Sequence, residues 1–184
     1  ASVFDDAWNK KVIESPFVSE LKETGFPVML RGMKKSIEIF REENIPLFTE
    51  LQNLETNYGA LTGALMVTIN GEEKTLQQAG ALLESTDRAE RESVYSTMVE
   101  KRLTIKNELN DLYTSLIEKR HKVALNSGFE NYRDYAFASL GRFDYGPAEC
   151  FEFHEAVAET VVPLLNEAAA KRKEEMGLDA LKPF

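Results

Sequence analysis

Cysteine is almost absent from this sequence, and its scarcity narrows the class of protein. The 184 residues contain one cysteine, Cys150, so no disulfide can form within the chain. A secreted scaffold held together by internal disulfides is therefore excluded, and a reducing compartment is favoured. The first residues also lack the basic and then apolar segments of a signal peptide. We therefore predict a cytoplasmic protein.

Long apolar runs and an excess of positive charge are missing as well. No apolar run approaches the roughly 20 residues that a membrane-spanning helix needs. The chain has 22 basic and 31 acidic residues, a net charge of −9, which argues against a surface built to neutralise nucleic-acid phosphates. The remaining composition, 43% hydrophobic and 29% charged, is that of a folded globular protein. Neither a nucleic acid nor a membrane is an expected partner.

Most of the chain shows the three- and four-residue apolar spacing of α-helices. The longest such segment spans residues 87–126 and ends before Gly128. Its first apolar stripe comprises Tyr95, Met98, Ile105, Leu109, Leu112, Leu116 and Val123, and its second comprises Val99, Leu103, Tyr113, Ile117 and Ala124. Two stripes predict helices packed on more than one side. The predicted fold class is all-α, an elongated helical bundle formed by residues 1–184 as a single helical fragment, with one small β-hairpin.

Proline, glycine and capping residues mark the ends of the other predicted helices. The expected segments run from Ser15-Pro16 to Gly25, from Pro27 to about Phe40, from about Pro46 toward Gly59 and Gly63, from Asn131 to Leu140, and from Pro147 to Met176-Gly177. Pro163 lies inside the last segment and should kink or split it, because proline lacks the amide proton of the helical ladder.

The predicted hairpin centres on Asn70-Gly71, which lies between Leu65–Ile69 and Glu72–Thr75. This pair suits a type I′ turn, whose two central residues both have positive φ. Thr75 and Gln78 then have the spacing of a capping box, so we expect a short helix to begin after Thr75.

Histidine is nearly as scarce as cysteine, which limits the metal and catalytic sites that the chain could hold. His154-Glu155 resembles the start of a zinc-binding His-Glu-x-x-His helix, in which two histidines four residues apart hold one ion. Ala158 stands where the second histidine would be, and His121 is distant in sequence. Cys150 is interpreted as a packing residue, although a Cys–His nucleophile pair with His154 stays open as an alternative. We predict no metal ligand and no catalytic residue in this chain.

Residues 128–145, here called the aromatic corner, are unusually rich in aromatic and charged side chains. Tyr132, Tyr135, Phe137, Phe143 and Tyr145 are interleaved with Arg133, Asp134, Arg142 and Asp144. Such a segment forms either a polar-lined binding surface or a turn between helices held by hydrogen bonds and cation–π contacts. The structural interpretation is favoured because the corner joins two long predicted helices.

Several motifs in combination resemble the oligoendopeptidase F-like zinc metallopeptidases, which are relatives of thimet oligopeptidase. The motifs are Asn126–Tyr135 (Asn-Ser-Gly-Phe-Glu-Asn-Tyr-Arg-Asp-Tyr), Arg142–Tyr145 (Arg-Phe-Asp-Tyr), Phe153-His154 and Val161–Pro163. Thr75-Leu76 and Ser85–Arg88 coincide with helix starts in that family, and Leu178–Phe184 coincides with its Leu-Arg-Pro-Trp-Asp segment, here with Lys182 and Phe184. The resemblance covers roughly residues 50–184.

The resemblance implies a helical fold around a deep channel, in which a zinc-activated water cleaves short peptides. It places the family's zinc ligands beyond Phe184. The chain also starts at Ala1 rather than at a methionine, which suggests that it is a portion of a longer protein. The chain is therefore expected to be a non-catalytic wall of the channel. Arg142 and Tyr145 are hypothesised to face the substrate, since arginine pairs with carboxylates and tyrosine donates to a carbonyl or an oxyanion.

Two other interpretations stay open, a helical adaptor that binds another protein and a small enzyme with an unrecognised site. An excised wall should also carry an uncovered apolar face and form a two-fold homodimer through it. The residues expected on that face are Val99, Leu103, Tyr113, Ile117, Leu178, Leu181 and Phe184.

Overall fold

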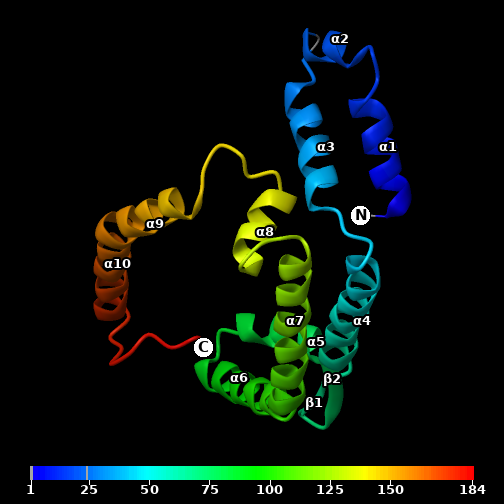
Figure 1. The fold of residues 1–184 in the computed structure, drawn as a ribbon. Coiled ribbons are helices and arrows are strands. Elements are labelled where there is room, and N and C mark those ends of the chain that lie inside the picture. The colour runs from blue at the N-terminus through cyan, green and yellow to red at the C-terminus, as the bar shows by residue number, and fades with distance from the viewer. Residues whose placement is uncertain (1, 24) are drawn as a thin grey trace. The chain divides into compact units, whose positions relative to one another are not determined.

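The computed structural model describes residues 2–23 and 25–184, whose contacts divide the chain into two compact units (Figure 1). Unit 1 comprises residues 1–56 and 111–146, and unit 2 comprises residues 57–110 and 147–184. Within the described ranges the chain is helical apart from one two-stranded hairpin, which confirms the predicted all-α class. That residues 1–184 act as one helical portion stays a prediction.

Unit 1 begins with three helices, α1 (Val3–Ile13), α2 (Val18–Glu23) and α3 (Pro27–Ile39), of which α1 and α3 pack side by side (Figure 1). Pro27 is in the first turn of α3, as predicted. Helix α1 was not predicted from the sequence. It begins with a capping box: Ser2 Oγ accepts from the Asp5 amide at 3.2 Å, and the Asp5 carboxylate accepts from the Ser2 amide at 2.8 Å.

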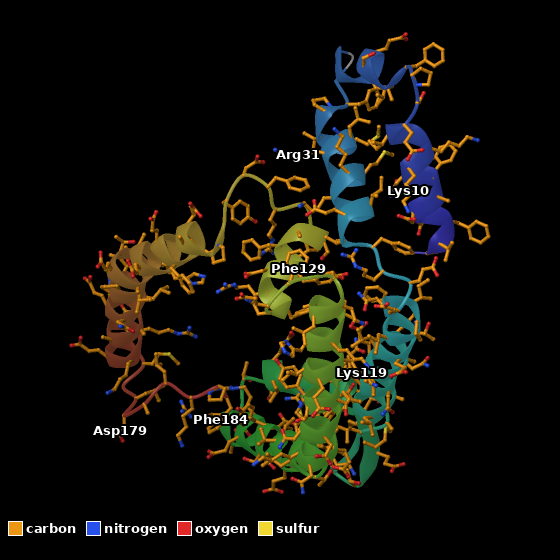
Figure 2. All side chains as sticks on the ribbon, in the orientation of Figure 1. Lys10, Arg31, Lys119, Phe129, Asp179 and Phe184 are labelled. Carbon is orange, nitrogen blue, oxygen red and sulfur yellow. The ribbon has the colours of Figure 1, made fainter. Side chains whose placement is uncertain are left out.

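The remaining helices of unit 1 are α4 (Asn44–Gly63) and α7 (Lys106–Asn126), which both extend into unit 2, and α8 (Tyr132–Ser139). Two ion pairs join α7 to α4. Lys119, labelled in Figure 2, pairs with Glu50, and Arg120 pairs with Glu55 at 3.0 Å. The buried apolar residues of the two helices include Leu47, Leu51, Leu112, Leu116, Val123 and Ala124. Burial of this set supplies the main hydrophobic stabilisation of unit 1.

A buried polar network joins the start of α4 to the end of α7. Asn44 is 1% exposed, and its amide donates to the Val123 carbonyl at 3.1 Å and to Ser127 Oγ at 3.0 Å. Asn126 donates to Asn44 Oδ1 at 2.8 Å, and Ser127 Oγ donates to the Ile39 carbonyl at 3.0 Å. Every polar atom of the Asn44 side chain is therefore engaged, which removes the cost of burying an amide.

Unit 2 contains the hairpin, β1 (Met66–Ile69) and β2 (Glu72–Thr75), followed by α5 (Leu76–Ala81), the 3₁₀-helix η1 (Leu82–Glu84) and α6 (Arg88–Leu103). Asn70 and Gly71 have φ of 55° and 81°, which confirms the predicted turn conformation. The Thr75–Gln78 capping box is also confirmed. The strands are antiparallel, with Ile69 opposite Glu72. The core of the unit consists of Val67, Ile69, Ala79, Val94 and Met98.

The continuous helix predicted over residues 87–126 is wrong, because the helix is interrupted at Thr104 and Ile105 between α6 and α7. The amides of Thr104 and Ile105 bond to carbonyls three residues back, at 3.2 and 3.4 Å. Thr104 Oγ1 also donates to the Lys101 carbonyl at 2.7 Å, so a side chain takes the place of the next helical donor. The two apolar stripes therefore do not run along one helix.

The last helices of unit 2 are α9 (Pro147–Ala156) and α10 (Val162–Glu175), separated by the π-helical segment η2 (Val157–Val161). Pro163 lies in the first turn of α10, which confirms that it splits the predicted helix. No residue of α9, η2 or α10 is buried. No described helix combines the length and apolar character needed to cross a bilayer.

We predict that Gly71→Ala lowers the free energy of unfolding by about 1 kcal/mol, because alanine is strained at positive φ. Gly59→Ala in α4 is the matched control. A Cβ at either position would meet no heavy atom within 4 Å, so the two sites differ in backbone conformation and not in space. The control should be neutral or stabilising by up to about 1 kcal/mol. Urea denaturation measures both, and equal effects would contradict the turn assignment.

We also predict that Asn44→Ala destabilises the chain by about 2–3 kcal/mol, since it removes three hydrogen bonds of a buried side chain and leaves the Asn126 amide without its Asn44 acceptor. Asn53→Ala removes the same side chain from an exposed position of α4 and should change stability by less than about 0.5 kcal/mol. Thermal unfolding followed by circular dichroism distinguishes them. Similar melting temperatures for the two variants would show that the network contributes nothing.

Candidate functional site

The aromatic corner begins where α7 stops. Gly128 has φ of 86°, its amide donates to the Leu125 carbonyl at 3.0 Å, and the Phe129 amide donates to the Ala124 carbonyl at 3.0 Å. This is a Schellman termination, which needs a residue in the left-handed region and so favours glycine. Phe129, labelled in Figure 2, then packs edge-on against Tyr135 with ring centroids 5.7 Å apart. The Asn-Ser-Gly-Phe motif therefore ends one helix and anchors the next.

Helix α8 is fixed at its start by Asn131, whose Oδ1 accepts from the Asp134 amide at 3.0 Å. The Asp134 carboxylate in turn accepts from Arg133 Nε at 2.8 Å and from Asn131 Nδ2 at 2.9 Å. The hydrogen bond from Arg133, followed by that from Asn131, lowers the pKa of Asp134. Burial raises the pKa of Tyr135, with a smaller effect from Tyr132. These groups are held in one arrangement around the start of the helix.

The end of α8 is a second Schellman turn, built on Gly141 with φ of 67°. The Gly141 amide donates to the Ala138 carbonyl at 3.2 Å, and the Arg142 amide donates to the Phe137 carbonyl at 3.0 Å. The turn brings Arg142 back over α8, where its guanidinium lies 4.9 Å from the centre of the Phe137 ring.

The structure brings together the two predicted site residues, Arg142 and Tyr145. The Arg142 guanidinium is 6.0 Å from the centre of the Tyr145 ring, and Tyr145 meets Phe137 edge-on with centroids 6.0 Å apart. Tyr145 is 47% exposed, and Arg142 is also exposed. Among the described residues no carboxylate forms an ion pair with Arg142.

The loop between α8 and α9 is held by a different arginine, Arg31 of α3, which is labelled in Figure 2. Its two terminal nitrogens bond to the Asp144 carboxylate at 3.2–3.3 Å, and its guanidinium stacks 4.3 Å from the centre of the Phe143 ring. The sequence did not indicate this contact, because its partners are 113 residues apart. Beside it lies a cavity of about 580 Å³, lined in part by Arg31, Lys34 and Phe143.

The residues considered for metal binding do not assemble into a metal site within the described ranges. No group of three or more histidine, cysteine, aspartate or glutamate side chains is placed to hold a metal ion there. His154 of α9 contacts the rings of Phe151 and Phe153, each with centroids 6.3 Å away. Cys150 is a free, half-buried thiol. The described residues therefore do not fit a zinc ion.

Comparison of the sequence with models of protein families identifies the family of this chain. The sequence model of peptidase family M3 matches residues 81–184. This chain belongs to peptidase family M3. Among curated proteins no sequence matches the chain. The matched region includes α6, α7, the aromatic corner and α9–α10, so the motifs that suggested the resemblance lie within it or directly before it.

Solved structures share the fold at low sequence identity. A protein assigned as oligoendopeptidase F, from crystals grown by microfluidic seeding, superposes with a TM-score of 0.91 at 23% identity over 97% of this chain. An assigned oligoendopeptidase F from Bacillus anthracis str. Ames and Pz peptidase A with an inhibitor each give 0.90 at 22% identity over 96%. The chain spans 32% of each of these proteins, about a third of their length. The M3 fold therefore extends well beyond the part represented here.

We predict that Arg31→Ala speeds amide hydrogen exchange in residues 141–146 by up to about thirtyfold, because an exposed ion pair and a cation–π contact each contribute up to about 1 kcal/mol. Lys34→Ala removes an exposed cation one turn later on α3 and is the control. Exchange measured by mass spectrometry should change in the first variant alone. Unchanged exchange in Arg31→Ala would mean that the loop is held by its own turn.

Proposed function

We propose that this chain is a helical, non-catalytic portion of a cytoplasmic, zinc-dependent oligoendopeptidase that hydrolyses short peptides. The observation that carries the proposal is the M3 family match over residues 81–184, together with a fold that covers about a third of related oligoendopeptidase structures. Metallopeptidases of this kind use a metal ion to polarise the peptide carbonyl and to activate water. This chain supplies walls and contacts, and the metal ligands come from elsewhere in the parent.

The side chains of this chain that could bind zinc support the proposal that the zinc ligands lie elsewhere in the parent. A catalytic zinc needs three protein ligands and an open position for water. His154 is followed four residues later by Ala158, and His121 lies on α7 in the other unit. Zinc is therefore assigned to the parent enzyme, with ligands outside residues 1–184, and none to this chain.

Arg142 and Tyr145 are proposed to contact the peptide substrate in the parent. Arg31 already holds the loop before α9, so Arg142 is not required for that task. Its guanidinium is oriented by Phe137 and Tyr145 while its donors stay available, which suits recognition of a peptide carboxylate or carbonyl. The exposed Tyr145 hydroxyl can donate to a neighbouring carbonyl.

Short peptides are the proposed partners, and the net charge of −9 is unsuited to nucleic acid. Self-association is a further proposal. In unit 1, Tyr113 and Ile117 are 60% and 51% exposed, as an uncovered apolar face requires. In unit 2, Leu103 is 59% exposed, whereas Val99 and Phe184 are half-buried. A homodimer would use the exposed members of this set.

We predict that the purified chain of residues 1–184 contains no stoichiometric zinc and does not cleave a quenched fluorescent peptide. Atomic absorption and a fluorescence assay measure the two properties, and the complete parent enzyme is the positive control. Hydrolysis by the chain that a chelator abolishes would contradict the proposal and establish a small enzyme with its own metal site. Loss of metal from the parent should abolish its activity without unfolding residues 1–184.

In the parent enzyme, Arg142→Ala should lower kcat/KM by about tenfold or more, the expected cost of one charge-assisted hydrogen bond. Its melting temperature should stay within a degree or two, since Arg142 makes no ion pair among the described residues. Arg102→Ala, an exposed arginine on α6, is the control and should leave kcat/KM unchanged. Equal losses of stability and activity in Arg142→Ala would show that the residue only holds the corner together.

A further inference from the structure

Unit 1 contains a small cavity where three of its helices meet. It has a volume of about 300 Å³ and lies between the end of α3, the first turns of α4 and one side of α8 (Figure 1). Tyr132, Tyr135 and Ser139 share one face of α8, and Ser36 and Phe40 share one face of α3. All its lining residues belong to unit 1, and neither end of the chain takes part. Ligand cavities begin at about this volume, so the cavity suits a small molecule.

One wall of the cavity is a buried tyrosine whose hydroxyl has no partner. Tyr135 is 7% exposed, and its ring is fixed by Phe129 and Tyr132, with ring centroids 5.7 and 5.8 Å away. Within the described ranges its hydroxyl forms no hydrogen bond, and it is not among the polar atoms sealed off from solvent. Because burial raises the pKa of Tyr135, the hydroxyl is protonated at neutral pH and can donate. A buried donor without a partner at a cavity wall favours a polar ligand.

The second polar group of the cavity is Arg41, which is held by one end of its guanidinium. Its Nη1 donates to the Glu38 and Phe40 carbonyls, at 2.9 and 2.6 Å, at the end of α3. Both N–H groups of Nη1 are therefore used, whereas Nε and Nη2 keep theirs. Within the described ranges Arg41 forms no ion pair with a carboxylate. The Nε–Nη2 edge has the two parallel donors that bind a carboxylate in a bidentate manner.

Aromatic rings form much of the remaining lining. Phe40, Phe48 and Tyr132 line the cavity, and the Arg120 guanidinium lies 5.9 Å from the centre of the Tyr132 ring. Asn44 also lines it, but the hydrogen bonds of its side chain are already made within the chain. No acidic side chain is among the described lining residues, so none of them would pair with an ammonium group.

We propose that this cavity binds a small aromatic monocarboxylate that carries no ammonium group. Arg41 would bind the carboxylate through Nε and Nη2, Tyr135 would donate a further hydrogen bond, and the aromatic walls would pack against the ring of the ligand. The ligand would contact α3, α4 and α8 together and so stabilise their arrangement. Such binding requires no peptide hydrolysis and goes beyond the proposed function.

The test uses residues 1–184 with ¹³C-labelled tyrosine rings, titrated with 3-phenylpropionate and followed by nuclear magnetic resonance. The chain has six tyrosines, and of these Tyr132 and Tyr135 line the cavity. We expect the signals of these two to shift and to saturate, whereas those of the other tyrosines stay in place as internal controls. Shifts that spare Tyr132 and Tyr135, that spread equally over all tyrosines, or that do not saturate would overturn the proposal.

Three further probes define the class of ligand. 3-Phenylpropanamide lacks the charge and should bind at least about tenfold more weakly, because hydrogen bonds to charged groups are the strong ones. Acetate lacks the ring, and phenylalanine adds an ammonium group that would be buried without a partner, so each should also bind at least about tenfold more weakly. An affinity equal to that of 3-phenylpropionate for any of the three would overturn the proposal.

Paired variants locate the site. Tyr135→Phe removes an unpartnered hydroxyl, so it should weaken binding by about tenfold and leave the melting temperature unchanged. Arg41→Lys keeps the charge but loses the bidentate edge, and it should weaken binding by about tenfold or more. Tyr113→Phe and Arg102→Lys make the same changes at exposed positions outside the cavity and should alter affinity by less than about twofold. Equal effects within each pair would overturn the proposal, and Tyr135→Phe decides alone if Arg41→Lys does not fold.

The complete parent enzyme provides the last check. Isothermal titration calorimetry should show that 3-phenylpropionate binds to the parent with an affinity similar to that for residues 1–184. No binding to the parent would show that the cavity is covered there, and it would overturn the proposal. Peptide hydrolysis is scored in a separate assay, so failure of this binding leaves the proposed function standing, and failure of hydrolysis leaves the binding result interpretable.

Discussion

The side-chain amide of Asn44 is the interaction on which the arrangement of unit 1 depends. It bonds to the last turn of α7 through Val123 and Ser127, and Ser127 bonds onward to the carbonyl of Ile39 at the end of α3. Three helices therefore converge on one buried polar group. The aromatic corner starts at the next residue, Gly128, so the position of α8 relative to α3 and α4 is set at this point. An apolar residue at position 44 could fill the space but could not specify the register of the three chain segments.

The local structure was predicted well wherever one or two residues decide it. Asn70-Gly71 has two positive φ angles, the Thr75–Gln78 box starts α5, and Pro163 divides the last helix, all as the sequence indicates. Helix α1 was missed although Ser2 and Asp5 have the spacing of a capping box, because its apolar periodicity is weak. The break at Thr104 was missed because the helical apolar spacing is strong and continues across it. The spacing gives no sign that the Thr104 hydroxyl bonds to the Lys101 carbonyl in place of a backbone amide.

The long-range contacts could not be predicted from a single sequence. Nothing near Asn44 indicates that it meets Ser127, and nothing near Arg31 indicates that it meets Asp144. The consequence for the candidate site is direct. The sequence favoured a structural role for the corner that contains Arg142 and Tyr145, and the structure shows that Arg31 also bonds to this loop.

Family membership is the finding on which the proposed role of this chain rests. The M3 match places the chain among peptidases, and the chain covers about a third of the related solved structures. Its two histidines, His121 and His154, lie on α7 and α9. The central claim is that this chain is one part of a longer M3 peptidase. The intact mass of the native protein, combined with peptide mapping, tests it most directly. We predict a mass well above the 20.8 kDa of residues 1–184, and a peptide with a His-Glu-x-x-His motif from the additional sequence. A native mass of 20.8 kDa would contradict the claim.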